Sequence, residues 1–118
     1  MLDAWGTICA LAATTTRLRL GTLVSPATFR HPPVVAKLAA TADEISGGRV
    51  SLGLGAGWHE REHAAFGFPY PATRERMEVF GEQLEIVRGL WERSRSPSRA
   101  ATTASTRSTP GLSRARPR

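Results

Sequence analysis

Apolar side chains recur at helical spacing in three stretches of the chain. The first covers Leu2 to Thr16, the second begins at Pro32 and ends before Gly47-Gly48, and the third runs from about Thr73 to Trp91. Intervals of three and four residues between apolar positions are typical of amphipathic helices. Proline suits the first turn of the second helix, and the paired glycines suit a left-handed helix end. We therefore predict three helices.

The same spacing predicts which side of each later helix is buried. For the second helix the expected apolar stripe is Val35, Leu38, Ala39, Ala42 and Ile45. For the third helix it is Met77, Phe80, Leu84, Val87 and Leu90/Trp91.

Two apolar runs between the helices have the character of strands. Leu18–Val24 alternates at first and ends apolar, and we expect Ser25-Pro26 to end it. Arg49–Gly55 follows the second helix directly. Because the connection between the runs contains a helix, the two strands should be parallel. The sequence therefore predicts an α/β fold with both strands ending at one edge, where such folds place their ligand sites.

The charge is unevenly distributed along the chain. Residues 1–93 carry ten basic and ten acidic side chains, whereas residues 94–118 carry six arginines and no acid, which accounts for the formal charge of +6. A uniformly basic nucleic-acid-binding domain is therefore excluded. Leu112 is the one large apolar side chain of residues 94–118. We predict one domain over 1–93 and a disordered Arg/Ser/Thr-rich tail over 94–118.

The cysteine content and the lengths of the apolar runs indicate in which cellular compartment the protein is expected. Cys9 is the only cysteine, so an internal disulfide and a cysteine-based zinc site are excluded. The longest apolar run, Ile8–Ala13, is far shorter than the roughly 20 residues of a membrane span. The start, Met1-Leu2-Asp3, lacks the basic region of a signal peptide. We expect a cytoplasmic protein with no membrane partner.

A glycine-rich segment, Gly53 to Gly57, follows the second predicted strand. The dinucleotide-binding fingerprint requires a further glycine at position 58, which is Trp58, and an acidic residue after another strand about 20 residues on. Because both are missing, we do not expect a classical dinucleotide site. The glycines still allow a flat or anionic ligand to approach the backbone, or they form only a tight turn.

The segment His59-Glu60-Arg61-Glu62-His63 matches the H-E-x-x-H pattern of zinc proteases, with Glu82 as a conceivable third ligand. Two features argue against zinc: the segment directly follows the glycine turn, and its interior positions carry no apolar side chain. A polar helix start, with Glu60 and Glu62 near the positive end of the helix dipole, is favoured. We expect no metal.

Eight short motifs, each weak alone, occur in a fixed order over residues 2–93. They are Ala4-Trp5 through Ala12-Ala13-Thr14, Leu18-Arg19-Leu20-Gly21-Thr22-Leu23-Val24, Phe29-Arg30-His31-Pro32, Ala36-Lys37, Ser46-Gly47-Gly48-Arg49, Leu52-Gly53-Leu54-Gly55-Ala56-Gly57-Trp58, Phe66-Gly67 and Leu90-Trp91. In this order and spacing they resemble the bacterial luciferase-like oxidoreductases, especially the deazaflavin-dependent branch. The fold of that family is a (β/α)₈ barrel. The resemblance implies that this chain is a piece of the barrel, from the helix before strand 3 to helix 4.

The resemblance also implies where a cofactor would bind. In the family the end of strand 3 passes close to the cofactor ring, often with a non-prolyl cis peptide bond, which maps here to about Leu23-Val24. The implied cofactor-binding residues are Leu23, Val24, Ser25, Gly55, Ala56, Gly57 and Trp58. The implied cofactor is a deazaflavin coenzyme (F-420 type), with FMN as the alternative.

Two positions depart from the family pattern. The sugar-phosphate dehydrogenases of the family often have an acid at position 58, so Trp58 argues against that substrate class. His59 stands where members often have asparagine, and no residue is identified as the proton donor. We expect a β-branched residue in place of Gly57 to fill the space that the ligand occupies and leave the fold intact.

The function implied is hydride transfer or oxygen activation on a small-molecule substrate, in a full-length form that is a homodimer. The chain alone should be inactive, because the missing barrel elements include a phosphate-binding segment. Two alternatives remain: a small α/β binding protein with a basic nucleic-acid-binding tail, and a zinc hydrolase using His59 and His63. The family normally continues past Trp91 with an acidic, strand-like segment, so the basic tail is not expected to be an evolved part of the protein. For that reason we expect no role for nucleic acid.

We predict that the tail is the product of a frameshift. When the codons of Arg95 to Thr106 are displaced by one nucleotide, suitable silent bases give Val-Thr-Phe-Glu-Gly-Arg-His-Tyr-Arg-Leu-Asp, the string that the family typically carries here. Sequencing the coding DNA around Glu92 to Arg95 tests this. The alternative frame should continue the barrel for well over a hundred residues, and early stop codons in it would refute the prediction.

Overall fold

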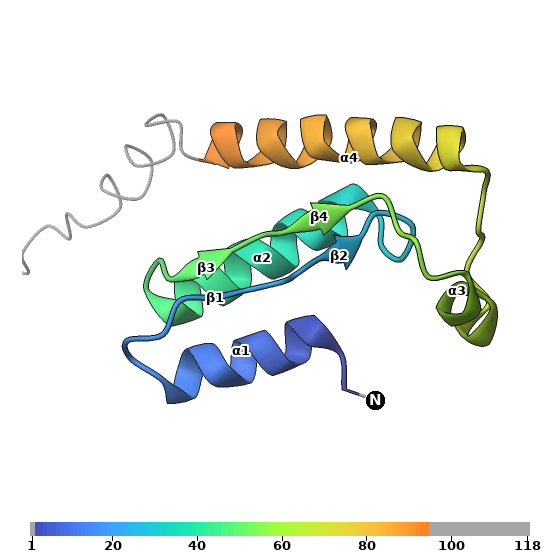
Figure 1. The fold of residues 1–118 in the computed structure, drawn as a ribbon. Coiled ribbons are helices and arrows are strands. Elements are labelled where there is room, and N and C mark those ends of the chain that lie inside the picture. The colour runs from blue at the N-terminus through green and yellow to red at the C-terminus, as the bar shows by residue number, and fades with distance from the viewer. Residues whose placement is uncertain (1, 95–118) are drawn as a thin grey trace, which may run out of the picture.

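The computed structural model describes residues 2–94, in which short parallel strands are covered by helices (Figure 1). The elements in chain order are α1 (Ala4–Thr14), β1 (Leu20–Gly21), β2 (Ser25–Pro26), α2 (Pro32–Ser46), β3 (Val50–Ser51), β4 (Leu54–Gly55), α3 (Glu60–Phe66) and α4 (Thr73–Ser94). The three predicted helices are confirmed as α1, α2 and α4. The tail predicted to be disordered lies, apart from Ser94, outside the described residues. Within that range no helix has the length and hydrophobicity needed to cross a lipid bilayer.

The strands form two parallel pairs. β1 pairs with β3, with Leu20 opposite Val50, and β2 pairs with β4, with Ser25 opposite Leu54. The predicted parallel orientation is confirmed, but each predicted strand is divided into two short ones. The expectation that Ser25-Pro26 ends the first strand is wrong, because these two residues themselves form β2.

The division of the strands has a local cause at Thr22 and Gly53. The Thr22 hydroxyl donates to the Gly53 carbonyl oxygen at 2.7 Å and accepts from the Gly53 N–H at 3.1 Å, in place of a backbone ladder. The next peptide bond, Leu23-Val24, is cis, which confirms the geometry that the family resemblance implied. A Cβ atom on Gly53 would lie 2.2 Å from the Thr22 carbonyl oxygen. The two segments therefore meet more closely than any side chain at position 53 would allow.

α2 packs between α1 and α4 on one side of the strands (Figure 1). The core joins Trp5 and Ile8 of α1 to Val35, Ala39 and Ala42 of α2, all buried. Small alanine side chains let neighbouring helices approach closely, so this narrow helix can contact both. Burial of these apolar surfaces is the main stabilising contribution to such a core.

The predicted stripe of α2 is confirmed except at its last position. Ile45 is 46% exposed, whereas the neighbouring Ser46 is buried. The Ser46 hydroxyl donates to the Asp43 carbonyl and accepts from the Arg49 N–H, so its polar atom is satisfied inside the fold. Gly47 then ends the helix with a left-handed φ of 68°, as predicted.

The buried side of α4 differs from the predicted one. The buried positions are Arg76, Gln83 and Val87, while Met77, Leu84 and Leu90 are exposed. The apolar stripe that we predicted is therefore wrong at these three exposed positions. In the first part of α4 the buried positions therefore lie one residue earlier than predicted. There Arg76 and Gln83 form hydrogen bonds to the carbonyl groups of loops beside the strands.

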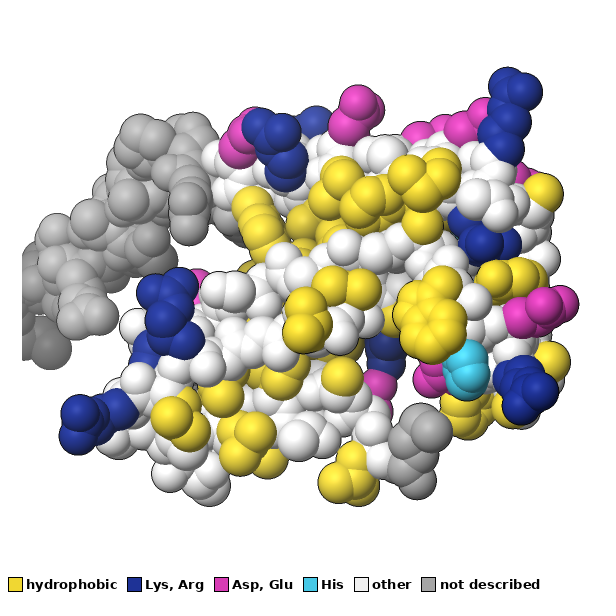
Figure 2. All heavy atoms as spheres, in the orientation of Figure 1, with side chains coloured by type: hydrophobic (Ala, Val, Ile, Leu, Met, Phe, Trp, Pro, Cys, Tyr) yellow, Lys and Arg dark blue, Asp and Glu magenta, His cyan; other side chains and the backbone are white. Residues whose placement is uncertain are grey.

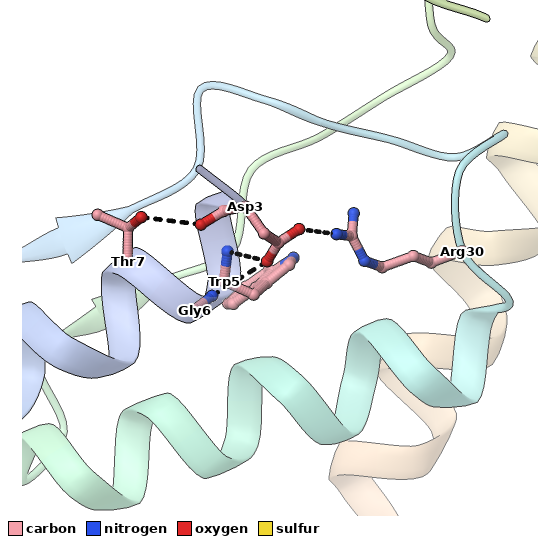
Figure 3. A network of polar contacts seen from close by, with 5 residues as sticks. All are labelled: Asp3, Trp5, Gly6, Thr7 and Arg30. Carbon is pink, nitrogen blue, oxygen red and sulfur yellow. Dashed lines mark hydrogen bonds and ion pairs between the residues drawn. The ribbon is translucent and has the colours of Figure 1, made fainter. Parts of the chain in front are cut away.

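The first turn of α1 is capped by Asp3 (Figure 3). Its carboxylate accepts from the N–H groups of Trp5 and Gly6, and it also pairs with Arg30 in the loop before α2. The Thr7 hydroxyl donates to the Asp3 carbonyl. An Asp cap satisfies N–H groups that otherwise have no partner in a helix, and the ion pair ties this end of α1 to that loop.

The last turn of α1 is held by Arg49, which follows α2. Its guanidinium donates to the carbonyl groups of Ala12, Thr15 and Leu18. Helix ends leave such carbonyls without partners. Arg49 therefore fixes the end of α1 and the start of β1 at the edge of the strand layer opposite the glycine-rich loop.

We expect Gly53→Ala to destabilise the fold and Gly81→Ala to stabilise it. A Cβ atom at position 53 meets backbone and should cost about 1–3 kcal/mol of unfolding free energy. Gly81 lies inside α4 with open space around its Cα, so alanine there should add about 0.5–1 kcal/mol. Urea unfolding followed by circular dichroism measures both, and equal effects of the two substitutions would contradict the close approach at Gly53.

Candidate functional site

The carboxyl ends of β2 and β4 border a cleft of about 480 Å³. Six of the seven residues predicted from the sequence line it, namely Leu23, Val24, Gly55, Ala56, Gly57 and Trp58. The seventh, Ser25, is buried and lines a neighbouring cleft of about 880 Å³ between the start of α1 and residues 22–26. The structure thus brings together two segments that are about 30 residues apart in the sequence.

The walls of the smaller cleft are largely apolar, and the side chains of His59, Glu62 and His63 also line it. Leu23 is fully exposed and Trp58 is 80% exposed, and Figure 2 shows apolar side chains gathered on the face that carries the strands. Val24 packs over β4, since a Cβ atom on Gly55 would lie 2.6 Å from its Cγ2. Large apolar side chains grouped on a surface are typical of a ligand or partner site. No lysine or arginine lines this cleft among residues 2–94, so its chemistry suits a flat, uncharged ring better than a phosphate.

Gly57 is also required by the backbone conformation of the loop. Its φ is +82°, a conformation that side chains other than glycine rarely adopt. A Cβ atom there would meet the Thr28 hydroxyl at 3.0 Å and the His63 ring at 3.4 Å. The expectation that an added side chain would spare the fold is therefore corrected: it would strain the turn and press against the half-buried Thr28 and the buried His63.

His63 packs against this loop, is almost completely buried and also lines the cleft. Its Nδ1 is 2.8 Å from the His59 carbonyl oxygen, which can only accept, so Nδ1 carries the proton. Its Nε2, 2.7 Å from the Thr28 hydroxyl, then accepts from that hydroxyl. The ring also lies edge-on to Phe29 and Tyr70. His63 therefore joins α3 to the loop before α2.

The zinc interpretation of the H-E-x-x-H segment does not fit this arrangement. Both ring nitrogens of His63 are used in hydrogen bonds within the protein. His59 is exposed and precedes α3, and residues 2–94 contain no group of three side chains placed to hold a metal. α3 begins at Glu60, so the favoured interpretation of this segment as a polar helix start is confirmed.

The loop after β4 is supported by Arg76 and Tyr70, which sequence reasoning did not identify. Arg76 donates to the Gly57 carbonyl at 3.1 Å, and the Tyr70 hydroxyl donates to the Trp58 carbonyl at 3.0 Å. The Arg76 guanidinium lies 4.1 Å from the centre of the Tyr70 ring. The sequence does contain a signal for Arg76, because it lies at helical spacing from Phe80 and Val87. A search for apolar side chains overlooks an arginine at such a position.

Gln83 supports the loop after β2 in the same way. Its side-chain N–H₂ donates to the Arg30 carbonyl at 2.9 Å and lies 3.4 Å from the Ala27 carbonyl. Gln83 is almost completely buried. α4 therefore contacts both loops that follow the second strand pair, through one polar side chain for each loop.

Comparisons with known proteins match this chain to a family. The family model of the luciferase-like monooxygenases matches residues 1–117. An F420-dependent glucose-6-phosphate dehydrogenase of Beutenbergia cavernae is 43% identical over 83 residues, which cover 70% of this chain and 24% of that protein.

Two solved structures have the same arrangement. The monooxygenase RslO1 from Streptomyces bottropensis matches with a TM-score of 0.66 and 36% identity, over 75% of this chain and 26% of that one. Riboflavin lyase RcaE, solved with modified FMN and riboflavin, matches with a TM-score of 0.67 and 32% identity, over 76% and 20%. The chain spans between 20% and 31% of the length of such relatives. Because the family match covers nearly all of its residues, the chain belongs to the luciferase-like monooxygenase family.

Proposed function

We propose that this chain is the part of a flavin- or deazaflavin-dependent barrel enzyme that holds the cofactor ring. It corresponds to strand 3 through helix 4 of the barrel. One observation carries the proposal: six residues chosen from the sequence line a single cleft at the carboxyl ends of parallel strands. Barrel enzymes bind their ligands at this end of the strands.

The residues of the cleft suit the ring of such a cofactor. Leu23 and Trp58 offer exposed apolar surface, and covering it with a flat ring removes that surface from water, at roughly 25 cal/mol per Å². The glycine backbone from Gly55 to Gly57 lets the ring approach closely. The bound cofactor would supply hydride transfer or oxygen activation. This chain's residues would orient the ring and exclude water from one side of it.

The phosphate-bearing end of the cofactor requires other contacts. Within residues 2–94, no lysine or arginine lines the cleft. We propose that this contact comes from the part of the family barrel that the chain does not span. We also propose that residues 94–118 are the frameshifted tail described above, and that the chain is a truncated form.

We propose a deazaflavin as the cofactor, with FMN as the alternative. The relative that is 43% identical is named for F420, whereas the riboflavin lyase, at 32% identity, was solved with modified FMN. Trp58 places an indole at the mouth of the cleft, so the substrate proposed is a small molecule other than a sugar phosphate. The full-length enzyme is proposed to be a cytoplasmic homodimer without nucleic-acid or membrane partners. Because the chain belongs to an oxidoreductase family, nucleic-acid binding by the tail is not favoured.

Weak binding of the ring should be visible by nuclear magnetic resonance. On titration of the ¹⁵N-labelled chain with FMN, or with the deazaflavin, we expect amide shifts to concentrate at Leu23–Ser25 and Gly55–Trp58. Trp58→Ala should weaken binding by up to about tenfold, because an aromatic contact is lost. Leu18→Ala is the control, since Leu18 is also exposed but precedes β1. Shifts scattered over the chain, or equal losses in both variants, would contradict the proposed site.

The purified 118-residue chain should not turn over substrate. Both edges of its strand layer are open in the described structure, and most contacts of a cofactor would lie in barrel elements that the chain does not span. The measurement is consumption of reduced FMN or reduced deazaflavin, compared with buffer alone. Turnover clearly above that background would show that the chain is a complete catalyst.

A further inference from the structure

In the loop that carries Gly57 and Trp58, two carbonyl groups accept hydrogen bonds from side chains that do not line the cleft. The Gly57 carbonyl accepts from Arg76, and the Trp58 carbonyl accepts from Tyr70. On the cleft side, the same residues line the space proposed for the cofactor ring. The position of the loop therefore depends on groups that do not themselves line that space.

Arg76 is the residue on which these contacts converge. Only 8% of its surface is exposed, and its guanidinium donates to the Gly57 and Pro71 carbonyls and to the Thr73 hydroxyl. It also stacks on Tyr70, the residue that holds Trp58. A buried charge is tolerated only when it is well hydrogen-bonded. Arg76 meets this condition by linking the start of α4 to the loop after β4.

We propose that Arg76 is a positioning residue, which sets the loop 55–58 for the cofactor ring without touching the ring. This rests on the proposed function, because it assigns Arg76 to the same site. The planar guanidinium donates in several fixed directions, which a lysine ammonium does not reproduce. Lysine at position 76 would therefore keep the charge but hold fewer of the three acceptors.

The chain offers a matched control on the same helix. Arg74 is 91% exposed in its side chain and pairs with Glu78 one turn along α4. Arg74→Gln thus removes the same charge from the same helix without touching the loop. The comparison is between Arg76→Gln, Arg76→Lys and Arg74→Gln, each in the full 118-residue chain.

The first measurement is amide hydrogen exchange without any ligand. We expect exchange of the Glu62 and His63 N–H groups, which donate to the His59 carbonyl at the end of the loop, to rise about tenfold in Arg76→Gln, the scale of a lost hydrogen bond to a charged group. In Arg76→Lys it should rise less, and in Arg74→Gln it should stay as in the wild type. Exchange in α2 should be unchanged in all three. Unchanged exchange of these two N–H groups, or an equal rise in α2, would overturn the proposal, the latter because Arg76 would then support the fold as a whole.

The second measurement is titration of the same variants with FMN. We expect about tenfold weaker binding by Arg76→Gln than by Arg74→Gln, in step with the exchange result. If the loop loosens while FMN affinity stays the same, Arg76 does not position the site and the proposal fails. If the wild type itself shows no FMN-induced shifts and no deazaflavin-induced shifts, the proposed function fails, and the assignment of Arg76 to a cofactor site fails with it. The exchange result then still decides whether Arg76 holds the loop.

Discussion

The close approach of Thr22 and Gly53 is the contact on which the arrangement of the strands depends. Position 53 has room for a hydrogen atom only, because the Thr22 carbonyl lies against it. The Thr22 hydroxyl then takes over the pairing of the Gly53 backbone where the ladder is interrupted. Beyond this point the Ser25 N–H bonds to the Gly53 carbonyl, and β2 and β4 pair. The cleft lies at the end of that second pair, so its position follows from the interruption.

The two ends of the strand layer have different structural roles. At the end where β1 and β3 begin, Arg49 binds the last carbonyls of α1, and its contacts are all within the scaffold. At the other end, Arg76 and Gln83 hold loops whose outer sides border the clefts. This division agrees with α/β barrels, in which one end of the strands serves stability and the other carries the ligand site.

Helices and loop glycines could be predicted from the sequence because their signals are local. The periodic apolar residues of α1 and α2, and the left-handed end at Gly47, depend on neighbouring residues only. The division of the strands could not be predicted in this way. It depends on a hydroxyl at position 22 meeting a backbone 31 residues away, and no propensity encodes that contact.

The apolar and glycine residues that line the cleft could be predicted from the sequence. The polar residues that hold the neighbouring loops in place could not. The residues from Leu23 to Trp58 that line the cleft were named through a family resemblance, and the structure brings six of them together. Arg76 and Gln83 were overlooked because hydrophobic periodicity treats polar residues as surface. Met77 was assigned to the core for the same reason, whereas it is 54% exposed.

Arg76 and Gln83 have a consequence for where the chain can change length. They lie two turns apart on one side of α4 and contact different loops. A single residue inserted between them would rotate one contact by about 100° relative to the other, and only one loop could keep its partner. Insertions and deletions between positions 76 and 83 should therefore be rare among related proteins.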